Sequence, residues 1–328
     1  MQGGLPSPDI TKPPSALEDQ LRELRVALAG KVPRKRPDQN LLIGTWNVRA
    51  FGDMNDKWLS AAGDSPQRAA FDVACIAEIV SCFDIVAIQE VRANLRSLRY
   101  MLKALGRNWG VLMTDVTKGK DGNNERMAFV YDTSRVRPSG LACELVEPVD
   151  AAGVATGAFN RQFARTPYAV SFATTTTTVI LTTLHVVYGS DLTDRGRELQ
   201  AIAEWLSDWA EQEEEWRHNL IAIGDFNIDR RGDELFDAFT STGLTPAPSL
   251  NEVPRTIFDT PKRQSFYDQI AWFADAHKGP LLTLDCSDAG SFDFVPNLQG
   301  NRTKTELSWH LSDHYPMYVE FALPPKPR

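Results

Sequence analysis

The stretch NLIAIGDFNID (219–229) joins a short apolar run to a group of polar residues. Residues 219–224 are mostly aliphatic, and a run of this length is typical of a buried strand. Asp225 and Asn227 follow the run directly. Loops just beyond strand ends are where a rigid scaffold displays reactive groups. The stretch therefore predicts a buried strand with two candidate site residues at its carboxyl end.

The same arrangement recurs along the chain. Similar apolar runs are LLIGTW (41–46), DIVAIQ (84–89), RMAFVY (126–131) and VILTTL (179–184). Asn47 follows the first run, Glu90 the second and His185 the last. Taken singly, each residue has a structural explanation as a turn residue, a charge at a helix start or a core histidine. Their shared position after strands is what favours a common site.

Amphipathic helices are predicted between these strands. Apolar residues recur at helical spacing over 71–82, 95–105 and 199–206, and Gly106 is a stop signal for the second helix. Strands and helices continue to the end of the chain without a second linker. We therefore predict one α/β domain over residues 41–323, with stacked sheets flanked by helices, and a short tail over 324–328.

Residues 1–40 differ in composition from this domain. Residues 1–15 are rich in proline, which predicts disorder. A helix beginning at Ser15 carries a leucine stripe at positions 17, 21, 24 and 28, and Gly30 is its predicted stop. We expect the stripe to pack on the main body, with a dimer seam as the alternative. The basic run KVPRKRPDQN (31–40) is predicted to be a solvated linker, with a nucleic-acid contact as the alternative.

Composition limits the classes of function. With 328 residues, 42% hydrophobic and 24% charged, the chain resembles an ordinary globular protein. A net charge of −8 argues against a wholly basic nucleic-acid binder, although a local site with a bound cation can still attract phosphate. None of the four cysteines (Cys75, Cys82, Cys143 and Cys286) lies in a CxxC motif, so a zinc site is not expected. Without a signal peptide or a membrane span, a cytoplasmic protein with reduced thiols is the expectation.

The polar residues form a set suited to phosphodiester hydrolysis. Glu90, Asp225 and Asp313 offer hard oxygen ligands of the kind that Mg²⁺ prefers. His185 and His314 can carry protons to and from the reacting oxygens. The amides of Asn47 and Asn227 can orient phosphate oxygens.

Eight ordered motifs resemble those of the DNase I-like endonuclease/exonuclease/phosphatase superfamily. They are TWNVRAFG (45–52), IQEVR (88–92), NERMAFVY (124–131), FARTPYAVSF (163–172), TLHVVYG (183–189), GDFNID (224–229), FYDQI (266–270) and LSDHYPM (311–317). The resemblance covers residues 41–322 in the family's order. It implies a four-layered αββα sandwich with the site at one edge of the two central sheets.

The resemblance also implies how a metal ion and a phosphate are held. Glu90 is similar to the principal Mg²⁺ ligand, with Mn²⁺ as a substitute ion, and Asp313 to the remaining metal ligand. Asn47 resembles the residue that positions metal and phosphate. Arg165 and Asn227 resemble residues that contact phosphate oxygens.

Proton transfer is implied for the remaining matches. Asp225 resembles the aspartate that holds metal or water. Glu125 resembles the carboxylate that orients a catalytic histidine, here His185. Asp268 resembles the carboxylate that orients the second histidine, His314. In each pair the carboxylate would fix the tautomer of the imidazole and raise its pKa.

Three departures from the family pattern bear on DNA contacts. Asn123 and Asn124 stand where an aromatic residue is common in DNase I-type enzymes. Gln269 replaces an arginine of a YDRI motif, and Thr166–Pro167 replaces a Glu–Pro pair. These changes leave the chemical set intact but argue against the family's minor-groove DNA contacts.

The branch of the superfamily is therefore a separate question. Abasic-site endonucleases usually lack the histidine at position 185, and inositol-polyphosphate 5-phosphatases carry a PAWCDRI-like motif that this chain lacks. We predict a Mg²⁺-dependent nuclease acting on DNA. A phosphatase or phosphodiesterase for a small or lipid phosphoester is the alternative, and a non-catalytic binding protein is the third. Arg165 is the main candidate for a DNA contact, with Arg49, Arg92 and Arg126 as weaker ones.

Overall fold

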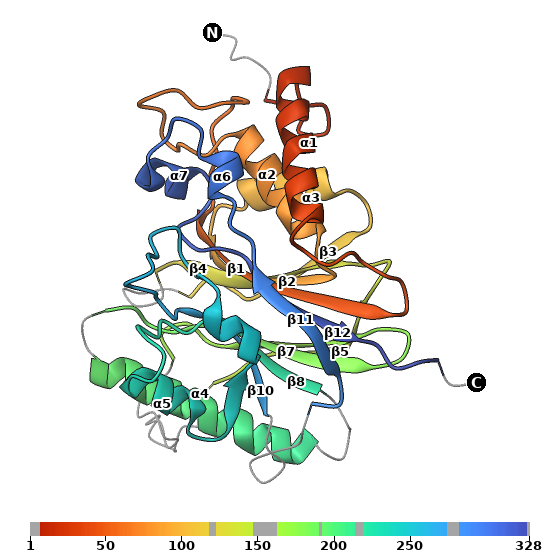
Figure 1. The fold of residues 1–328 in the computed structure, drawn as a ribbon, viewed down its shortest axis with the longest axis vertical. Helices are drawn as coiled ribbons and strands as arrows, with labels where there is room; N and C mark the ends of the chain where they lie inside the picture. The colour runs from red at the N-terminus through yellow and green to blue at the C-terminus, as the bar shows by residue number, and fades with distance from the viewer. Residues whose placement is uncertain are drawn as a thin grey trace.

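Two six-stranded sheets lie face to face at the centre of the computed structural model, with helices on both outer faces (Figure 1). The structure describes residues 7–117, 123–146, 163–189, 192–213, 219–273 and 282–326. The layers run helix, sheet, sheet, helix from top to bottom of Figure 1. The four-layered αββα sandwich predicted from the sequence is confirmed.

The first sheet has the strand order β11-β12-β1-β2-β4-β3. Its strands are β1 (Asn40–Phe51), β2 (Ile85–Arg92), β3 (Trp109–Met113), β4 (Glu125–Asp132), β11 (Asp285–Ser291) and β12 (Met317–Ala322). Strand β1 pairs parallel with β2 and antiparallel with β12. The amino- and carboxyl-terminal parts of the chain thus share the centre of this sheet.

The second sheet has the strand order β5-β6-β7-β8-β10-β9. Its strands are β5 (Arg137–Glu144), β6 (Tyr168–Ala173), β7 (Thr178–His185), β8 (Asn219–Asp225), β9 (Leu244–Pro246) and β10 (Asp268–Phe273). Strand β8 pairs parallel with β7 and antiparallel with β10. All five strands predicted from apolar runs are present, in β1, β2, β4, β7 and β8.

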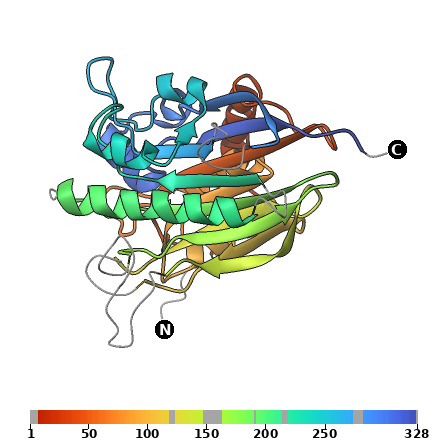
Figure 2. The same ribbon diagram turned by 90° about the horizontal axis from the view of Figure 1, so that it is seen from below.

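Helices cover the outer face of each sheet. On the first sheet lie α1 (Ser15–Ala29), α2 (Ala70–Ser81), α3 (Arg96–Leu105), α6 (Val295–Leu298) and α7 (Lys304–His310). The second sheet is covered by α4 (Leu192–Glu213) and α5 (Glu234–Thr240), and a 3₁₀ helix, η2, spans Pro248–Glu252. Figure 2 shows the long α4 lying across this sheet.

The core has three apolar layers because both faces of each sheet are buried. Alternate residues of β1 point to opposite faces. Leu41 and Ile43 pack between the sheets, whereas Leu42 and Trp46 pack under the helices of the first sheet. Burial on both faces requires apolar side chains at successive positions, which explains the continuous apolar runs in the sequence.

Two predicted strand ends need correction. Asn47 and Glu90 were expected just beyond β1 and β2, but both strands continue past them. The pairing register shifts between Asn47 and Phe51 and between Ile88 and Val91. Glu90 has a φ of 60°, which is uncommon for a residue with a Cβ. An irregularity inside each strand, rather than its end, therefore displays these side chains.

The amino-terminal segment packs on the main body. The stripe of Leu17, Leu21, Leu24 and Leu28 is buried in the helix layer over the first sheet. Disorder predicted for residues 1–15 is wrong for residues 7–14, because Ile10 is only 3% exposed and Asp9 pairs with Lys103 at 2.8 Å. Residues 1–6 lie outside the described residues.

The basic run 31–40 also lies against the body. Lys35 pairs with Asp132 at 3.1 Å, and Arg36 pairs with Glu320 at 2.8 Å. These two cations are therefore neutralised within the fold, which weakens the nucleic-acid alternative for this run. All four cysteines are free, and within the described ranges no helix is long and apolar enough to cross a bilayer.

We predict that Leu24→Ala lowers the free energy of unfolding by about 2–5 kcal/mol, because it leaves a cavity beneath α1. Leu24 is 1% exposed. Val26→Ala is the matched control on the same helix, since Val26 is 70% exposed and should change stability by less than about 0.5 kcal/mol. Urea titration followed by circular dichroism measures both. Equal stability of the two variants would contradict this packing.

Candidate active site

One pocket of about 500 Å³ gathers the predicted site residues. Its lining includes Asn47, Glu90, Glu125, Arg165, His185, Asp225, Asn227, Asp313 and His314. Asp268, the remaining predicted residue, is fully buried and hydrogen-bonded to His314. The structure thus brings together the whole predicted set from six strands, the segments before β6 and after β8, and the loop before β12.

Strand pairing explains this convergence. His185 ends β7 and Asp225 ends β8, and the two residues are register partners in a parallel pair. Asn47 belongs to the other sheet and is register partner to Gln89, next to Glu90. Asn47 Nδ2 donates a hydrogen bond to Asp225 Oδ2 at 2.9 Å. This bond joins the two sheets at the floor of the pocket.

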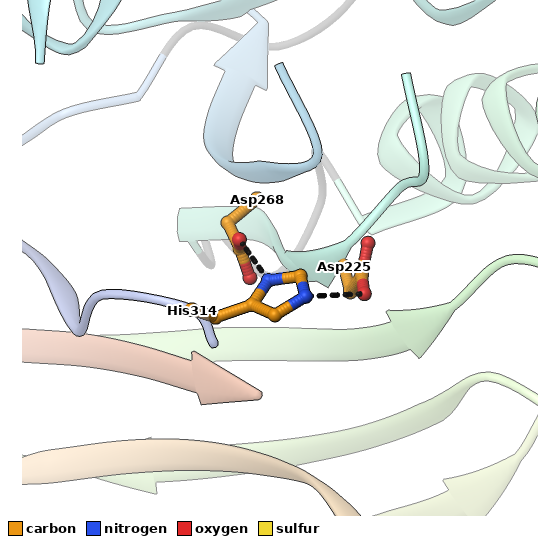
Figure 3. A group of neighbouring side chains, drawn as sticks. All are labelled: Asp225, Asp268 and His314. Atoms are coloured by element: carbon orange, nitrogen blue, oxygen red, sulfur yellow. Dashed lines mark hydrogen bonds and ion pairs between the residues drawn. The ribbon is translucent and has the colours of Figure 1, made fainter. Parts of the chain in front are cut away.

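His314 lies between two carboxylates (Figure 3). Its Nδ1 is 2.7 Å from Asp268 Oδ2, and its Nε2 is 4.0 Å from Asp225 Oδ2. Burial lowers the pKa of His314, but Asp268, Asp225 and Asp313 outweigh burial and raise it well above the ordinary value. The imidazole is therefore oriented through Nδ1 while Nε2 faces the pocket.

His185 has a comparable but looser arrangement. Its Nδ1 lies 3.1 Å from Glu125 Oε2, without the alignment of a hydrogen bond, and its Nε2 lies 3.6 Å from Asp225 Oδ2. Burial raises the pKa of Glu125, but His185, Arg165 and Arg92 outweigh it and lower the pKa to about 2. Both predicted carboxylate–imidazole pairs are thus in contact, and both imidazoles face Asp225.

Asp225 is a buried carboxylate between the two histidines. Burial raises its pKa, but His314, His185 and the amides of Asn47 and Asn227 have the larger combined effect and lower it. The backbone N–H of Asn227 donates to Asp225 Oδ1 at 3.0 Å. An ionised carboxylate in this position can accept a hydrogen bond from a donor group or bind a cation.

Asn123, which departs from the family pattern in the sequence, is also a site residue. Its Nδ2 donates to Glu125 Oε1 at 2.6 Å, and its φ of 55° turns the chain into β4. Arg165 donates from Nε to Glu125 Oε2 at 2.6 Å. The Nε atom of Arg165, the predicted phosphate-binding residue, is therefore already engaged by Glu125. Its Nη1 atom is buried beside the pocket without a hydrogen-bond partner. The position of Asn123 two residues before Glu125 is the sequence signal that could have identified it.

Hard oxygen atoms suited to a divalent cation line the pocket. Asn47 Oδ1 is buried without a hydrogen-bond partner. The hydrogen bonds to the Glu90 carboxylate, from Ala50 N and Arg92 Nη2, both go to Oε2. Asp313 has a 3.6 Å contact with Arg49. A Mg²⁺ ion typically takes one or two carboxylates and several waters, so this donor set fits the predicted ion.

A second group could hold a metal by distance alone. Single ligand atoms of Asp225, Asp268 and His314 all lie within 4.8 Å of one another. Asp268 is fully buried and already engaged by His314 Nδ1, so we favour it as an orienting partner. Glu90 and Asp313 line the pocket and are partly exposed, so together with Asn47 they are the better candidate set.

Arg68, which was not predicted from the sequence, holds the site-bearing segments together. The side chain is 3% exposed and donates hydrogen bonds to the carbonyls of Arg49, Ala50, His310 and Leu311. These carbonyls lie just after Asn47 and just before Asp313. A lone arginine between predicted elements carries no sequence signal for such a role.

The weaker DNA-contact candidates are engaged within the protein. Arg92 donates to the carbonyl of Asn123 at 2.7 Å, and Arg126 donates to the carbonyl of Arg92 at 3.2 Å. Arg49 donates to Ser308 and stacks on Trp309. Gln269 is fully buried and donates to the carbonyl of Phe266, so its side chain does not line the pocket.

We predict that Mg²⁺ or Mn²⁺ raises the melting temperature and that Glu90→Gln removes most of the rise. Binding to the folded state alone contributes about 2.7 kcal/mol at 100 times Kd. Differential scanning fluorimetry with EDTA as reference measures the shift without requiring turnover. Glu23→Gln, an exposed substitution on α1, is the control. An equal rise for Glu90→Gln and the native chain would exclude Glu90 as a ligand.

Comparisons with known proteins show which proteins this chain is similar to. No protein-family model matches the chain. A deoxyribonuclease from Thioalkalivibrio sp. (strain K90mix) is 27% identical over 295 residues, covering 86% of this chain and 71% of that protein.

Solved structures show the same architecture. An endonuclease/exonuclease/phosphatase family protein from Bacteroides thetaiotaomicron aligns with a TM-score of 0.57 and 19% identity, over 88% of this chain and 100% of that one. The mannosyl-6-phosphatase Bt3783 of the same organism aligns with a TM-score of 0.56 and 17% identity, over 86% and 99%. The resemblance drawn from the motifs is confirmed, and the chain has the DNase I-like fold of endonuclease/exonuclease/phosphatase family proteins.

Proposed function

We propose that this chain is a divalent-metal-dependent phosphoester hydrolase that cleaves DNA. The observation that carries the proposal is the convergence of two carboxylate–imidazole pairs on Asp225, beside unsatisfied oxygen and guanidinium groups in one pocket. Similarity to a deoxyribonuclease supports the hydrolase class and favours DNA. A cytoplasmic location stays a prediction from the sequence.

The pocket residues can carry out hydrolysis by in-line attack. One imidazole accepts a proton from the attacking water, whose oxygen forms the new bond to phosphorus. The bond to the leaving oxygen breaks, and the other imidazole, as imidazolium, donates a proton to that oxygen. The products are a phosphomonoester and an alcohol. Which histidine takes which role is left open.

The remaining residues would orient these groups and the phosphate. Asp268 and Glu125 hold the imidazoles, and Asn47 holds Asp225. Arg165 Nη1 is available for a phosphate oxygen. A divalent ion held by Glu90 and Asp313, with Asn47 Oδ1, would neutralise developing negative charge on the phosphate.

A small or lipid phosphoester is the second candidate substrate. The pocket volume of about 500 Å³ is within the usual range for small-ligand sites. A mannosyl-6-phosphatase is among the structural neighbours. A non-catalytic binding role is the third reading, but the intact acid, base and ligand set gives it little support.

We predict that His185→Ala and His314→Ala each lower kcat by at least about 10²-fold, the usual scale for general acid–base catalysis. The double variant should lose much less than the product of the single effects, because both groups act on one transition state. His310→Ala is the comparison, since His310 pairs with Asp72 and lies outside the pocket. A His185 or His314 variant with native turnover would remove that histidine from the mechanism.

We also predict cleavage of DNA in the presence of Mg²⁺ or Mn²⁺, abolished by EDTA. Supercoiled plasmid, single-stranded and duplex oligonucleotides, bis(4-nitrophenyl) phosphate and sugar phosphates form a suitable panel. Gel electrophoresis and phosphate release report the products. Intact nucleic acid at high enzyme concentration, together with turnover of a small phosphoester, would replace the first proposal with the second.

A further inference from the structure

Two further pockets adjoin the catalytic pocket. One, of about 520 Å³, is formed by the segments after β8 and before β10, and shares Arg263, Ser265 and Tyr267 with the catalytic pocket. We call it the basic pocket. The other, of about 480 Å³, is lined by the end of β1, by residues between β1 and α2, and by Trp309 of α7. Arg49 of this Trp309 pocket lies 3.6 Å from Asp313, which lines the catalytic pocket.

The two pockets reach the catalytic pocket from different layers. The basic pocket is built on loops of the second sheet, and the Trp309 pocket on the first sheet and its helices. The catalytic pocket has lining residues from both sheets. A chain-like ligand lying over the catalytic pocket could therefore enter both neighbours, whereas a small phosphoester would need only the central one.

Uncompensated positive charge gathers in the basic pocket. Arg230, Lys262 and Arg263 are exposed, and across the described part of the chain none of them forms an ion pair. Asp229, the acidic residue of this pocket, is paired with Arg195. In a protein of net charge −8, three free cations beside the site favour a polyanionic ligand.

Exposed aromatic side chains lie in the catalytic pocket and the Trp309 pocket. Tyr188 and Phe258 line the catalytic pocket and are 68% and 48% exposed, and Trp309 is 46% exposed. The guanidinium of Arg49 stacks on the Trp309 ring at 3.8 Å. Aromatic rings beside cations are the means by which proteins bind unpaired nucleic-acid bases and their phosphates. Bases stacked inside a duplex would not present a face to these rings.

We infer that the three pockets form one binding track for a polynucleotide strand whose bases are unpaired near the scissile phosphate. The basic pocket takes phosphates on one side of the cleaved bond, and Trp309 stacks on a base on the other side. This inference rests on the proposed nuclease function and deepens it by naming a single-stranded substrate class.

The phosphate contacts are tested by salt dependence. Single-strand binding weakens with a log–log slope of roughly −0.7 per phosphate contact, so R230Q/K262Q should make the slope for a 20-nucleotide strand shallower by about 1.4. Fluorescence anisotropy in Ca²⁺ with a catalytically impaired His185→Ala background measures binding without turnover. R99Q/R107Q removes two exposed cations that line none of the three pockets and should leave the slope unchanged.

The stacking contact is tested by chain length. W309A should lower the ratio of kcat/KM for the 20-nucleotide strand to that for a dinucleotide by roughly five- to 100-fold, the range for loss of one stacked base. W309F keeps an aromatic ring and should retain most of the ratio. The same sequence as a blunt duplex should be a poorer substrate than the single strand, and its cleavage should not respond to W309A.

The results of these experiments distinguish a failure of the binding track from a failure of the proposed nuclease function. If the native enzyme cuts the strand but neither the salt slope of R230Q/K262Q nor the length ratio of W309A changes, the track is wrong and the nuclease stands. Equal cleavage of duplex and single strand also overturns the track. If no oligonucleotide is cut while bis(4-nitrophenyl) phosphate is hydrolysed, the nuclease proposal itself falls.

Discussion

The hydrogen bond from Asn47 to Asp225 is the contact on which the site depends, because it joins the two sheets where their polar residues meet. Asn47 belongs to β1 and Asp225 ends β8. Each sheet contributes only part of the chemical set. Glu90, Glu125 and the loop carrying Asp313 and His314 come with the first sheet, whereas His185, Asp225 and Asp268 come with the second. Face-to-face packing of the sheets is therefore what assembles the pocket.

Burial gives the polar groups of this pocket their chemical character. A buried charge is costly unless it is paired or hydrogen-bonded. For Asp225, two asparagine contacts and two nearby imidazoles offset this cost. For Glu125, contacts with Arg165, Asn123 and His185 offset it. Among the site atoms without a hydrogen-bond partner, which also include His185 Nδ1 and Asp268 Oδ1, Asn47 Oδ1 and Arg165 Nη1 are the two for which a cation and a phosphate offer compensation. The pattern of satisfied and unsatisfied atoms thus supports the proposed chemistry.

A layer of buried arginines supports the groups that face the pocket. Arg68 ties the end of β1 to the segment before Asp313, and Arg255 donates to the carbonyl of Asp268 at 3.0 Å while it stacks on Phe266. A planar guanidinium has donors in fixed directions and can bridge several carbonyls at once. Burial lowers the pKa of each of these arginines to about 10. Both contribute position and not proton transfer.

The class of fold and most of the candidate site could be predicted from the amino-acid sequence. Local signals are strong there: apolar runs mark strands buried on both faces, and the order of motifs around Asn47, Glu90, Asp225 and His314 carries the family resemblance. The remaining features could not be predicted and are visible only in the folded structure. Asn123 donates a hydrogen bond to Glu125, and Arg68 donates hydrogen bonds to four backbone carbonyls. Glu90 lies at an irregularity within β2 and not at a strand end. Residues 7–14 pack on the body of the protein, and Lys35 and Arg36 form ion pairs. These features depend on contacts between segments far apart in the chain, and such contacts leave no local pattern of spacing or composition to read.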